Sequence, residues 1–139
     1  MQRSAMRELA FKYIYGLEIQ KDVEPDVLEV FIENNEIEEK EVQDYLNKIN
    51  GKLKECNTEI EELIVHNLKK NWSLDRISKV NLSLIKLAII EMLYLDLPYK
   101  VAINEAIELA KKYSDNQAST FINGILASIV KEKKLENDK

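Results

Sequence analysis

Four side chains near the start of the sequence, two basic and two aromatic, could bind a polyanion. Arg3, Arg7, Phe11 and Tyr15 are four residues apart, a spacing that places them in one row on a helix. Guanidinium groups pair with phosphates, and aromatic rings stack on nucleic-acid bases. The same row also fits a structural role, with half-buried rings and arginines that extend over the surface. The spacing therefore indicates either an RNA-binding face or the border of a helix core.

Groups suited to catalysis or metal binding are few. The chain has one histidine, His66, and one cysteine, Cys56. Neither belongs to a nucleophile motif, a cluster with metal-ligand spacing or a glycine-rich phosphate loop. The acidic pairs at 38–39 and 61–62 lie in a highly charged stretch, where carboxylates are usually solvated surface. We therefore expect a protein that is not an enzyme and that uses no cofactor or metal.

Charge is unevenly distributed along the chain. Residues 22–62 contain 14 acidic side chains and four lysines, a local charge of -10. Because the net charge is -5, the remainder carries +5. An acidic side and a mildly basic remainder leave room for an anionic ligand on one face. Charge alone fits an ordinary solvated surface equally well.

The composition indicates how many domains the chain has and which cellular compartment suits it. With 139 residues, 45% hydrophobic and 32% charged, the chain has the length of one soluble domain. A single cysteine excludes an internal disulfide and suits a reducing compartment. The charged opening MQRSAMRELAF does not read as a secretory signal, and Lys86 and Glu91 interrupt the longest apolar stretch, residues 80–97. We expect a cytoplasmic protein without a membrane partner.

Only three glycines and two prolines favour an all-α fold with short connections. Apolar residues recur at three- and four-residue spacing, which predicts a compact single-domain bundle of about seven helices. The expected elements are helices over 3–19, 26–34, 38–53, 58–71, 80–95, 101–113 and 114–130, and a turn or half-helix over 72–77. Capping-box sequences at Thr58 and Ser114 mark two of the helix starts. Residues 1–132 should form the domain and residues 133–139 a frayed polar tail.

The Asn-Gly pair in FINGIL, residues 121–126, conflicts with this pattern. Asn-Gly between apolar residues is a strong hairpin signal. Yet a helical apolar stripe continues from Ala118 to Val130, so we predict a helix. Gly124 then costs about 1 kcal/mol relative to alanine, and we expect close approach of another helix or a ligand to explain it. On that interpretation, Gly124→Leu would overpack the contact and destabilise the protein by roughly 1–3 kcal/mol.

Four stretches carry a family resemblance. They are RELAFKYIY (7–15), RISKVNLSLIKLAIIEMLY (76–94), PYKVAINEAIELAKKY (98–113) and FINGIL. By these stretches the chain resembles the NusB family of bacterial transcription antitermination factors, and the resemblance extends over nearly the whole chain. The resemblance implies a NusB-like RNA-binding domain that binds boxA-type single-stranded RNA together with NusE, a small-subunit ribosomal protein. The pair would join other Nus factors and RNA polymerase, notably during ribosomal RNA synthesis.

The resemblance also implies RNA-contacting residues. Arg3 and Arg7 match the family's arginine-rich opening, although Ser4 replaces a further arginine. Phe121 matches the aromatic residue of a second RNA-contacting region, with Lys100 nearby in the motif. With the helix row included, the expected RNA-binding residues are Arg3, Arg7, Phe11, Lys100, Gln117 and Phe121. Gln117 stands where the family usually has an acidic residue.

Three further positions are associated with NusE in the family. They fall on Tyr15, Asp75 and Asn81, and Asn81 replaces an acid that is common there. We expect these residues to form the partner-binding site.

Two other readings remain open. Some ribosomal RNA cytosine methyltransferases begin with a NusB-like domain, but this chain ends at Lys139 without room for a methyl-donor-binding domain, so we do not expect that enzyme. A helical adaptor that binds no RNA is the other alternative, and the acidic net charge favours it. The sequence leaves monomer and homodimer equally open.

Overall fold

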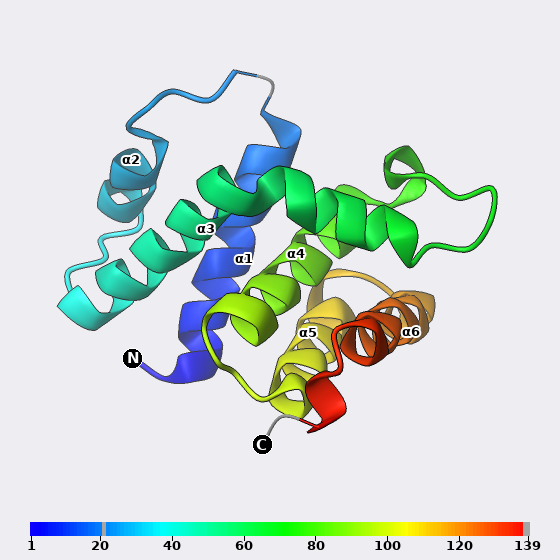
Figure 1. Ribbon diagram of the computed structural model, residues 1–139. Coiled ribbons are helices and arrows are strands. Elements are labelled where there is room, and N and C mark those ends of the chain that lie inside the picture. The colour runs from blue at the N-terminus through cyan, green and yellow to red at the C-terminus, as the bar shows by residue number, and fades with distance from the viewer. Residues whose placement is uncertain (21, 138–139) are drawn as a thin grey trace.

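The computed structural model describes residues 1–20 and 22–137, and the regular structure in that part of the chain is helical. Six α-helices and two 3-10 turns form one bundle (Figure 1). In chain order they are α1 (Arg3–Ile19), α2 (Val27–Asn34), α3 (Lys40–His66), η1 (Leu74–Arg76), α4 (Lys79–Tyr94), α5 (Tyr99–Tyr113), α6 (Asn116–Glu132) and η2 (Leu135–Asn137). The predicted all-α fold is confirmed. Among the described residues, no helix combines the length and apolar character needed to cross a membrane.

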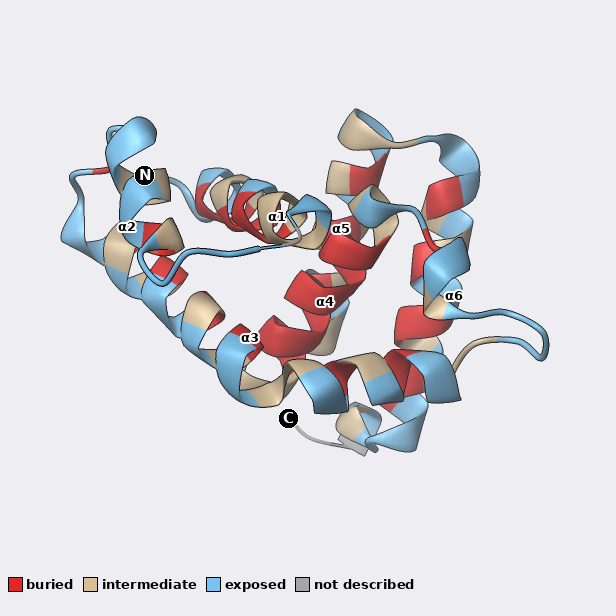
Figure 2. Ribbon diagram, turned by 90° about the horizontal axis from the view of Figure 1, so that it is seen from above, coloured by how far each residue is buried: buried red, intermediate tan, exposed pale blue. Residues whose placement is uncertain are grey.

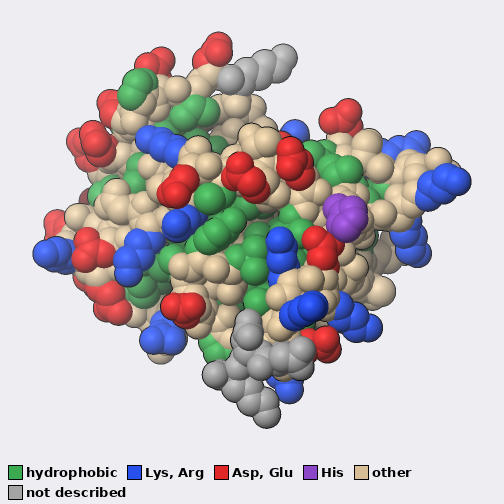
Figure 3. Space-filling view, in the orientation of Figure 1, with side chains coloured by type: hydrophobic (Ala, Val, Ile, Leu, Met, Phe, Trp, Pro, Cys, Tyr) green, Lys and Arg blue, Asp and Glu red, His purple; other side chains and the backbone are tan. Residues whose placement is uncertain are grey.

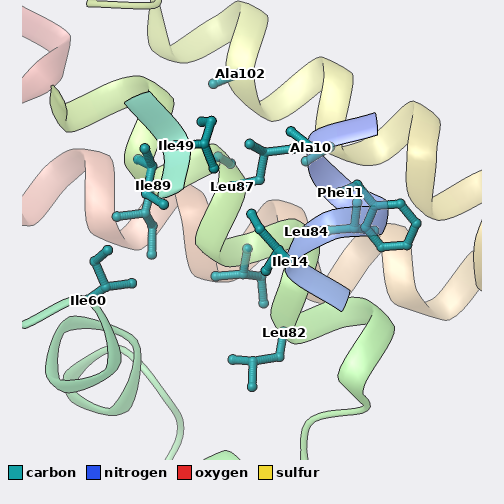
Figure 4. Close-up of a cluster of buried hydrophobic side chains, with 14 of the residues drawn as sticks. Ala10, Phe11, Ile14, Ile49, Ile60, Leu82, Leu84, Leu87, Ile89 and Ala102 are labelled. Atoms are coloured by element: carbon teal, nitrogen blue, oxygen red, sulfur yellow. The ribbon is translucent and has the colours of Figure 1, made fainter. Parts of the chain in front are cut away.

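Helix α4 lies at the centre of the bundle and is covered by α1, α3, α5 and α6. Every residue from Leu82 to Met92 is buried, and Figure 2 shows this helix as almost continuously buried. Figure 4 shows the resulting core, in which side chains of α4 pack among Ala10 of α1, Ile60 of α3 and Ala102 of α5. The predicted burial of this helix on most sides is confirmed.

The two helices predicted over 38–53 and 58–71 are wrong, because α3 is one helix of 27 residues. The capping box at Thr58 has no effect, since the buried stripe continues across it from Leu53 to Ile60 and Ile64 without a break in spacing. No proline interrupts this stretch, and Gly51 alone does not end a helix that buries a full stripe. The bundle therefore has six helices, one fewer than expected.

Helix α6 begins after a side-chain cap and ends at Glu132. The carboxylate of Asp115, and not the hydroxyl of Ser114, caps the helix by accepting a hydrogen bond from the backbone N–H of Ala118 at 2.8 Å. The helix ends at Glu132, and Leu135 in η2 packs against the core. That residues 133–139 fray stays a prediction, and residues 138–139 lie outside the described part of the chain.

Two oppositely charged residues of α4 are buried, and both are held by neighbouring helices. Oε2 of Glu91 accepts hydrogen bonds from Nε of Arg7 in α1 at 3.0 Å and from the hydroxyl of Tyr45 in α3 at 3.2 Å. Arg7 also donates to Glu105 of α5 at 3.1 Å. Burial raises the pKa of the Glu91 carboxyl, and the guanidinium beside it opposes that rise. This cluster joins four helices at one end of α4.

The second buried charge is Lys86, whose side chain is 1% exposed. Its Nζ lies 2.6 Å from Oε2 of Glu18 in α1, and 2.7 Å and 2.9 Å from Glu61 Oε2 and Asn57 Oδ1 in α3. An ammonium group has three N–H donors, so all three are satisfied. The Lys86 and Glu91 clusters together hold α1 and α3 against the same helix.

A more exposed set of hydrogen bonds connects α1 to the end of α5. The Glu8 carboxylate accepts hydrogen bonds from Lys112, at 2.7 Å, and from the hydroxyl of Tyr113. The ring of Tyr113 in turn lies 5.0 Å, centroid to centroid, from that of Phe11. The two hydrogen bonds lower the pKa of Glu8, because they favour the ionised carboxylate.

Arg7→Ala should destabilise the protein by about 3–5 kcal/mol, because it leaves Glu91 buried beside Glu105 without a cation. Chemical denaturation measures the free energy of unfolding. The matched control is Arg3→Ala, one turn earlier and exposed, for which we expect a change within about 0.5 kcal/mol. Equal effects of the two substitutions would contradict the structural role of Arg7.

The Glu8 contacts should make stability depend on pH. Because the folded pKa of Glu8 is lowered, its contribution is fully present above the ordinary pKa of about 4.3 and is lost as the pH falls through the lowered value. Parent protein should be more stable than Glu8→Gln near neutral pH, and the difference should shrink in acid. The control is Glu29→Gln, an exposed residue of α2. A difference that stays constant or grows on acidification would contradict this assignment.

Candidate nucleic-acid interface

Two members of the expected RNA-binding row on α1 are buried. Arg7 is 7% exposed, with its guanidinium held by the two glutamates, and Phe11 is 3% exposed, packed against Tyr113. At these two positions the row is therefore not part of the exposed surface. The alternative, that the row borders the core, accounts for both. Arg3 alone supplies an exposed cation in this row.

Arg3 lies at the mouth of a large cleft between α1, α3 and the α4–α5 loop. The cleft measures about 1100 Å³, and Glu91 and Tyr45 are among its lining residues. Its charged lining is mixed, with Lys48 and Lys52 beside Asp44 and other acids. Such a lining does not favour a polyanion over other ligands.

The remaining expected RNA contacts lie on the α5–α6 pair, and the structure separates them. Lys100 is in the first turn of α5, whereas Gln117 is in the first turn of α6. Two residues connect these helices, so they run antiparallel and their first turns lie at opposite ends, roughly 20 Å apart. Gln117 and Phe121 are one turn apart on α6 and share a face. The structure therefore groups Gln117 with Phe121 and places Lys100 elsewhere.

Phe121 does not stand alone, because it is stacked on Trp72. The two ring centroids are 5.8 Å apart with an angle of 28° between the planes. Phe121 is partly buried, whereas Trp72 is 44% exposed. Of this aromatic pair, Trp72 presents the larger surface to solvent.

Trp72 belongs to a segment that we call the basic connector, Asn67–Lys79, which links α3 to α4. It carries four exposed cations and one acid, and among the described residues none of the four cations has a carboxylate partner within 4.0 Å. The cations are Lys69, Lys70, Arg76 and Lys79. Figure 3 shows Lys and Arg side chains gathered at the right edge, where Figure 1 places this segment. The sequence signal was the run KKNW, which combines two lysines with the only tryptophan and was not recognised as a site.

The residues expected at the NusE site lie on three elements. Asp75 is exposed in η1, and Asn81 is partly buried in the first turn of α4, where its backbone N–H bonds to the Ser78 hydroxyl at 3.1 Å. Tyr15 is on α1, with its ring 6.2 Å from that of Phe11. No hydrogen bond or aromatic contact in the described residues joins Tyr15 to the other two.

The Asn-Gly pair of FINGIL lies within α6, which confirms the predicted helix and excludes a hairpin. The predicted packing contact at Gly124 is wrong within this chain. The residue is exposed, and a Cβ built on it would have no atom within 4 Å. The sequence analysis offered two reasons for the glycine, a neighbouring helix or a ligand. Since no neighbouring helix approaches it, the ligand is the reason that remains.

The fold is an all-helical bundle in which the exposed Trp72 of the basic connector stacks on the partly buried Phe121 of α6. The NusB family model matches residues 4–131. The transcription antitermination protein NusB of Acetivibrio thermocellus is 43% identical over 99% of this chain and 94% of its own length. The crystal structure of T. maritima NusB superimposes with a TM-score of 0.86 and 33% identity, covering 98% of this chain and 97% of that one.

The chain belongs to the NusB family of transcription antitermination proteins. This family is one of RNA-binding factors without enzymatic activity, which confirms the expectation that the chain is not an enzyme. Another similar structure contains the antitermination factors NusB and NusE in complex with double-stranded RNA. Its matched chain has a TM-score of 0.83 and 25% identity, over 94% of this chain and 96% of that chain.

Replacement of Gly124 by alanine should stabilise the protein by about 1 kcal/mol, because alanine is the better helix former and the added methyl meets nothing. Gly124→Leu should stabilise it too, contrary to the expectation from sequence. Gly51→Ala in α3 is a matched control, as its Cβ position is equally open. Thermal unfolding measures the melting temperatures of the Gly124 variants and of Gly51→Ala. If the melting temperature falls for the Gly124 variants and not for Gly51→Ala, the side chain at Gly124 meets a contact that the structure lacks.

Proposed function

We propose that this chain binds boxA-type single-stranded RNA together with NusE and joins the Nus complex on RNA polymerase, notably during ribosomal RNA synthesis. The observation that supports this most strongly is the near full-length similarity to a NusB whose structure holds both NusE and RNA. Transcription takes place in the bacterial cytoplasm, so the proposal also locates the protein there.

The charge distribution supports an RNA ligand despite the acidic composition. The basic connector, whose four cations have no carboxylate partner among the described residues, contacts Phe121 through Trp72, and Gln117 adds an amide one turn away on α6. Cations contact phosphates without reading sequence, whereas aromatic rings and amides contact bases. Selection of boxA would therefore depend on the α6 side of this surface, and affinity on the connector.

NusE docking is proposed for Tyr15, Asp75 and Asn81, of which Asp75 lies within the basic connector and the other two lie outside it. Asp75 is exposed and acidic, and the other two side chains are partly buried and uncharged. These three supply polar and apolar contacts but no cation, which suits a protein partner better than a phosphate backbone. The two binding events should therefore be separable by substitution.

Added positive charge at Asp75 or Asn81 should weaken NusE binding without unfolding the protein. Asn81→Lys and Asp75→Lys should each lower the affinity for NusE in isothermal titration calorimetry, while the circular dichroism spectrum stays that of the parent. Glu29→Lys on α2 makes a comparable charge change away from both residues and should bind NusE normally. Unchanged affinity in both variants would remove Asp75 and Asn81 from the interface.

RNA binding should be tested with the chain alone and with NusE. The ligands are a boxA single strand, a scrambled strand and a boxA duplex, because the similar NusB–NusE structure contains double-stranded RNA. We expect the boxA strand to bind best and NusE to increase its affinity. Arg3→Ala should weaken binding and lower the salt slope by about 0.7, the value for one lost phosphate contact on a single strand. Absence of binding to all three RNAs, with and without NusE, would refute the proposed function and leave a helical adaptor.

A further inference from the structure

The stacked pair of Trp72 and Phe121 has one open aromatic face. The two rings are stacked with a centroid distance of 5.8 Å and a tilt of 28°. Trp72 is 44% exposed, whereas Phe121 is partly buried, so the indole offers more aromatic surface to solvent. A base that approaches this surface therefore meets Trp72 before Phe121.

Charge around Trp72 favours a polyanion over an apolar partner. Lys69 and Lys70 precede it by three and two residues, and Arg76 follows in η1. All three are exposed and have no salt-bridge partner in the described part of the chain. Exposed cations beside an aromatic face are the two elements that single-stranded nucleic-acid sites combine.

The basic connector contacts α6 at two points, one on each side of Gly124. Trp72 packs on Phe121, and Asn67 accepts a hydrogen bond from the Ser128 hydroxyl at 2.6 Å. Phe121, Gly124 and Ser128 follow one another at three- and four-residue spacing, so they lie on one face of α6. Between the two contacts, Gly124 is exposed with no atom within 4 Å of a Cβ position. The helix backbone is therefore open next to the aromatic pair.

We propose that Trp72 is the platform on which an unpaired RNA base stacks, supported from behind by Phe121. Lys69 and Lys70 pair with the flanking phosphates, and the missing side chain at Gly124 admits the sugar-phosphate backbone beside the ring. This inference rests on the proposed function and identifies Trp72, in place of the partly covered Phe121, as the residue that touches the base.

Trp72 is the only tryptophan in the chain, so its fluorescence reports on this site alone. Binding of a boxA single strand of about 12 nucleotides, labelled for anisotropy, should quench the tryptophan emission with the same midpoint as the anisotropy change. The same RNA as a duplex should not quench it, because its bases are already stacked. The emission difference between parent and Trp72→Phe isolates the signal of Trp72 when NusE is present.

Substitutions separate stacking from charge. Trp72→Ala should weaken single-strand binding by roughly 5- to 150-fold with little change in the salt slope, and Trp72→Phe should recover part of the loss. Lys69→Gln combined with Lys70→Gln should lower the salt slope by about 0.7 for each lost contact. Thermal melting confirms that each variant is folded.

Gly124 provides a test in which stability and binding change in opposite directions. Gly124→Leu should raise the melting temperature and weaken RNA binding, since its side chain fills the open space beside Trp72. Gly51→Leu, on α3, should raise the melting temperature equally and bind RNA as the parent does. If the two leucine variants bind RNA equally, no backbone passes over Gly124.

The outcomes distinguish this inference from the function on which it rests. Tight single-strand binding with unquenched tryptophan emission and an unaffected Trp72→Ala variant would overturn the platform and leave the proposed function standing. Quenching by the duplex as strong as by the single strand would also overturn it, because the internal bases of a duplex are stacked on both faces and cannot stack on the indole. No binding of any RNA, with or without NusE, would overturn both.

Discussion

The structure depends on the desolvated charges of α4. A helix with no solvent-exposed stripe cannot carry Lys86 and Glu91 unless each is fully paired, because an unpaired buried charge is strongly destabilising. Both find partners on the same two helices, α1 through Glu18 and Arg7, and α3. A shift of α1 or α3 along α4 would separate both buried charges from their partners. The pairs thus select one arrangement of the three helices.

That arrangement determines where the proposed RNA surface lies. The continuous α3 of 27 residues runs across α4, and its end reaches α6, where His66 Nδ1 lies 2.7 Å from Glu132 Oε1. The basic connector then passes beside α6 from this end toward Phe121. Had α3 broken at Thr58, as its capping box indicated, the connector would not be held against α6 at both ends. The position of Trp72 follows from the length of α3.

Much of the fold could be predicted from local sequence, because helices with strong periodicity are recognised by spacing alone. The error at Thr58 arose because a capping box is a local signal, whereas the stripe through Leu53 and Ile60 is buried by tertiary packing. Arg7 illustrates a different limit. Its spacing puts it at the border of the core, and whether it faces solvent depends on Glu91, 84 residues away in sequence. No local pattern shows that Arg7 pairs with Glu91. The stacking of Trp72 on Phe121 is likewise absent from any local pattern.

Gly124 shows how a correct secondary structure can still hide a functional constraint. Its helix was predictable from the stripe, but the reason for the glycine was sought in packing, where the structure offers none. A residue that lowers helix stability and contacts nothing has no benefit to the isolated fold. Proteins tolerate such local losses where an open backbone serves binding. Gly124 lies one turn from Phe121, on which the exposed Trp72 is stacked, and the proposed nucleotide on Trp72 would give that loss a physical reason, since it needs the space that a larger residue would fill.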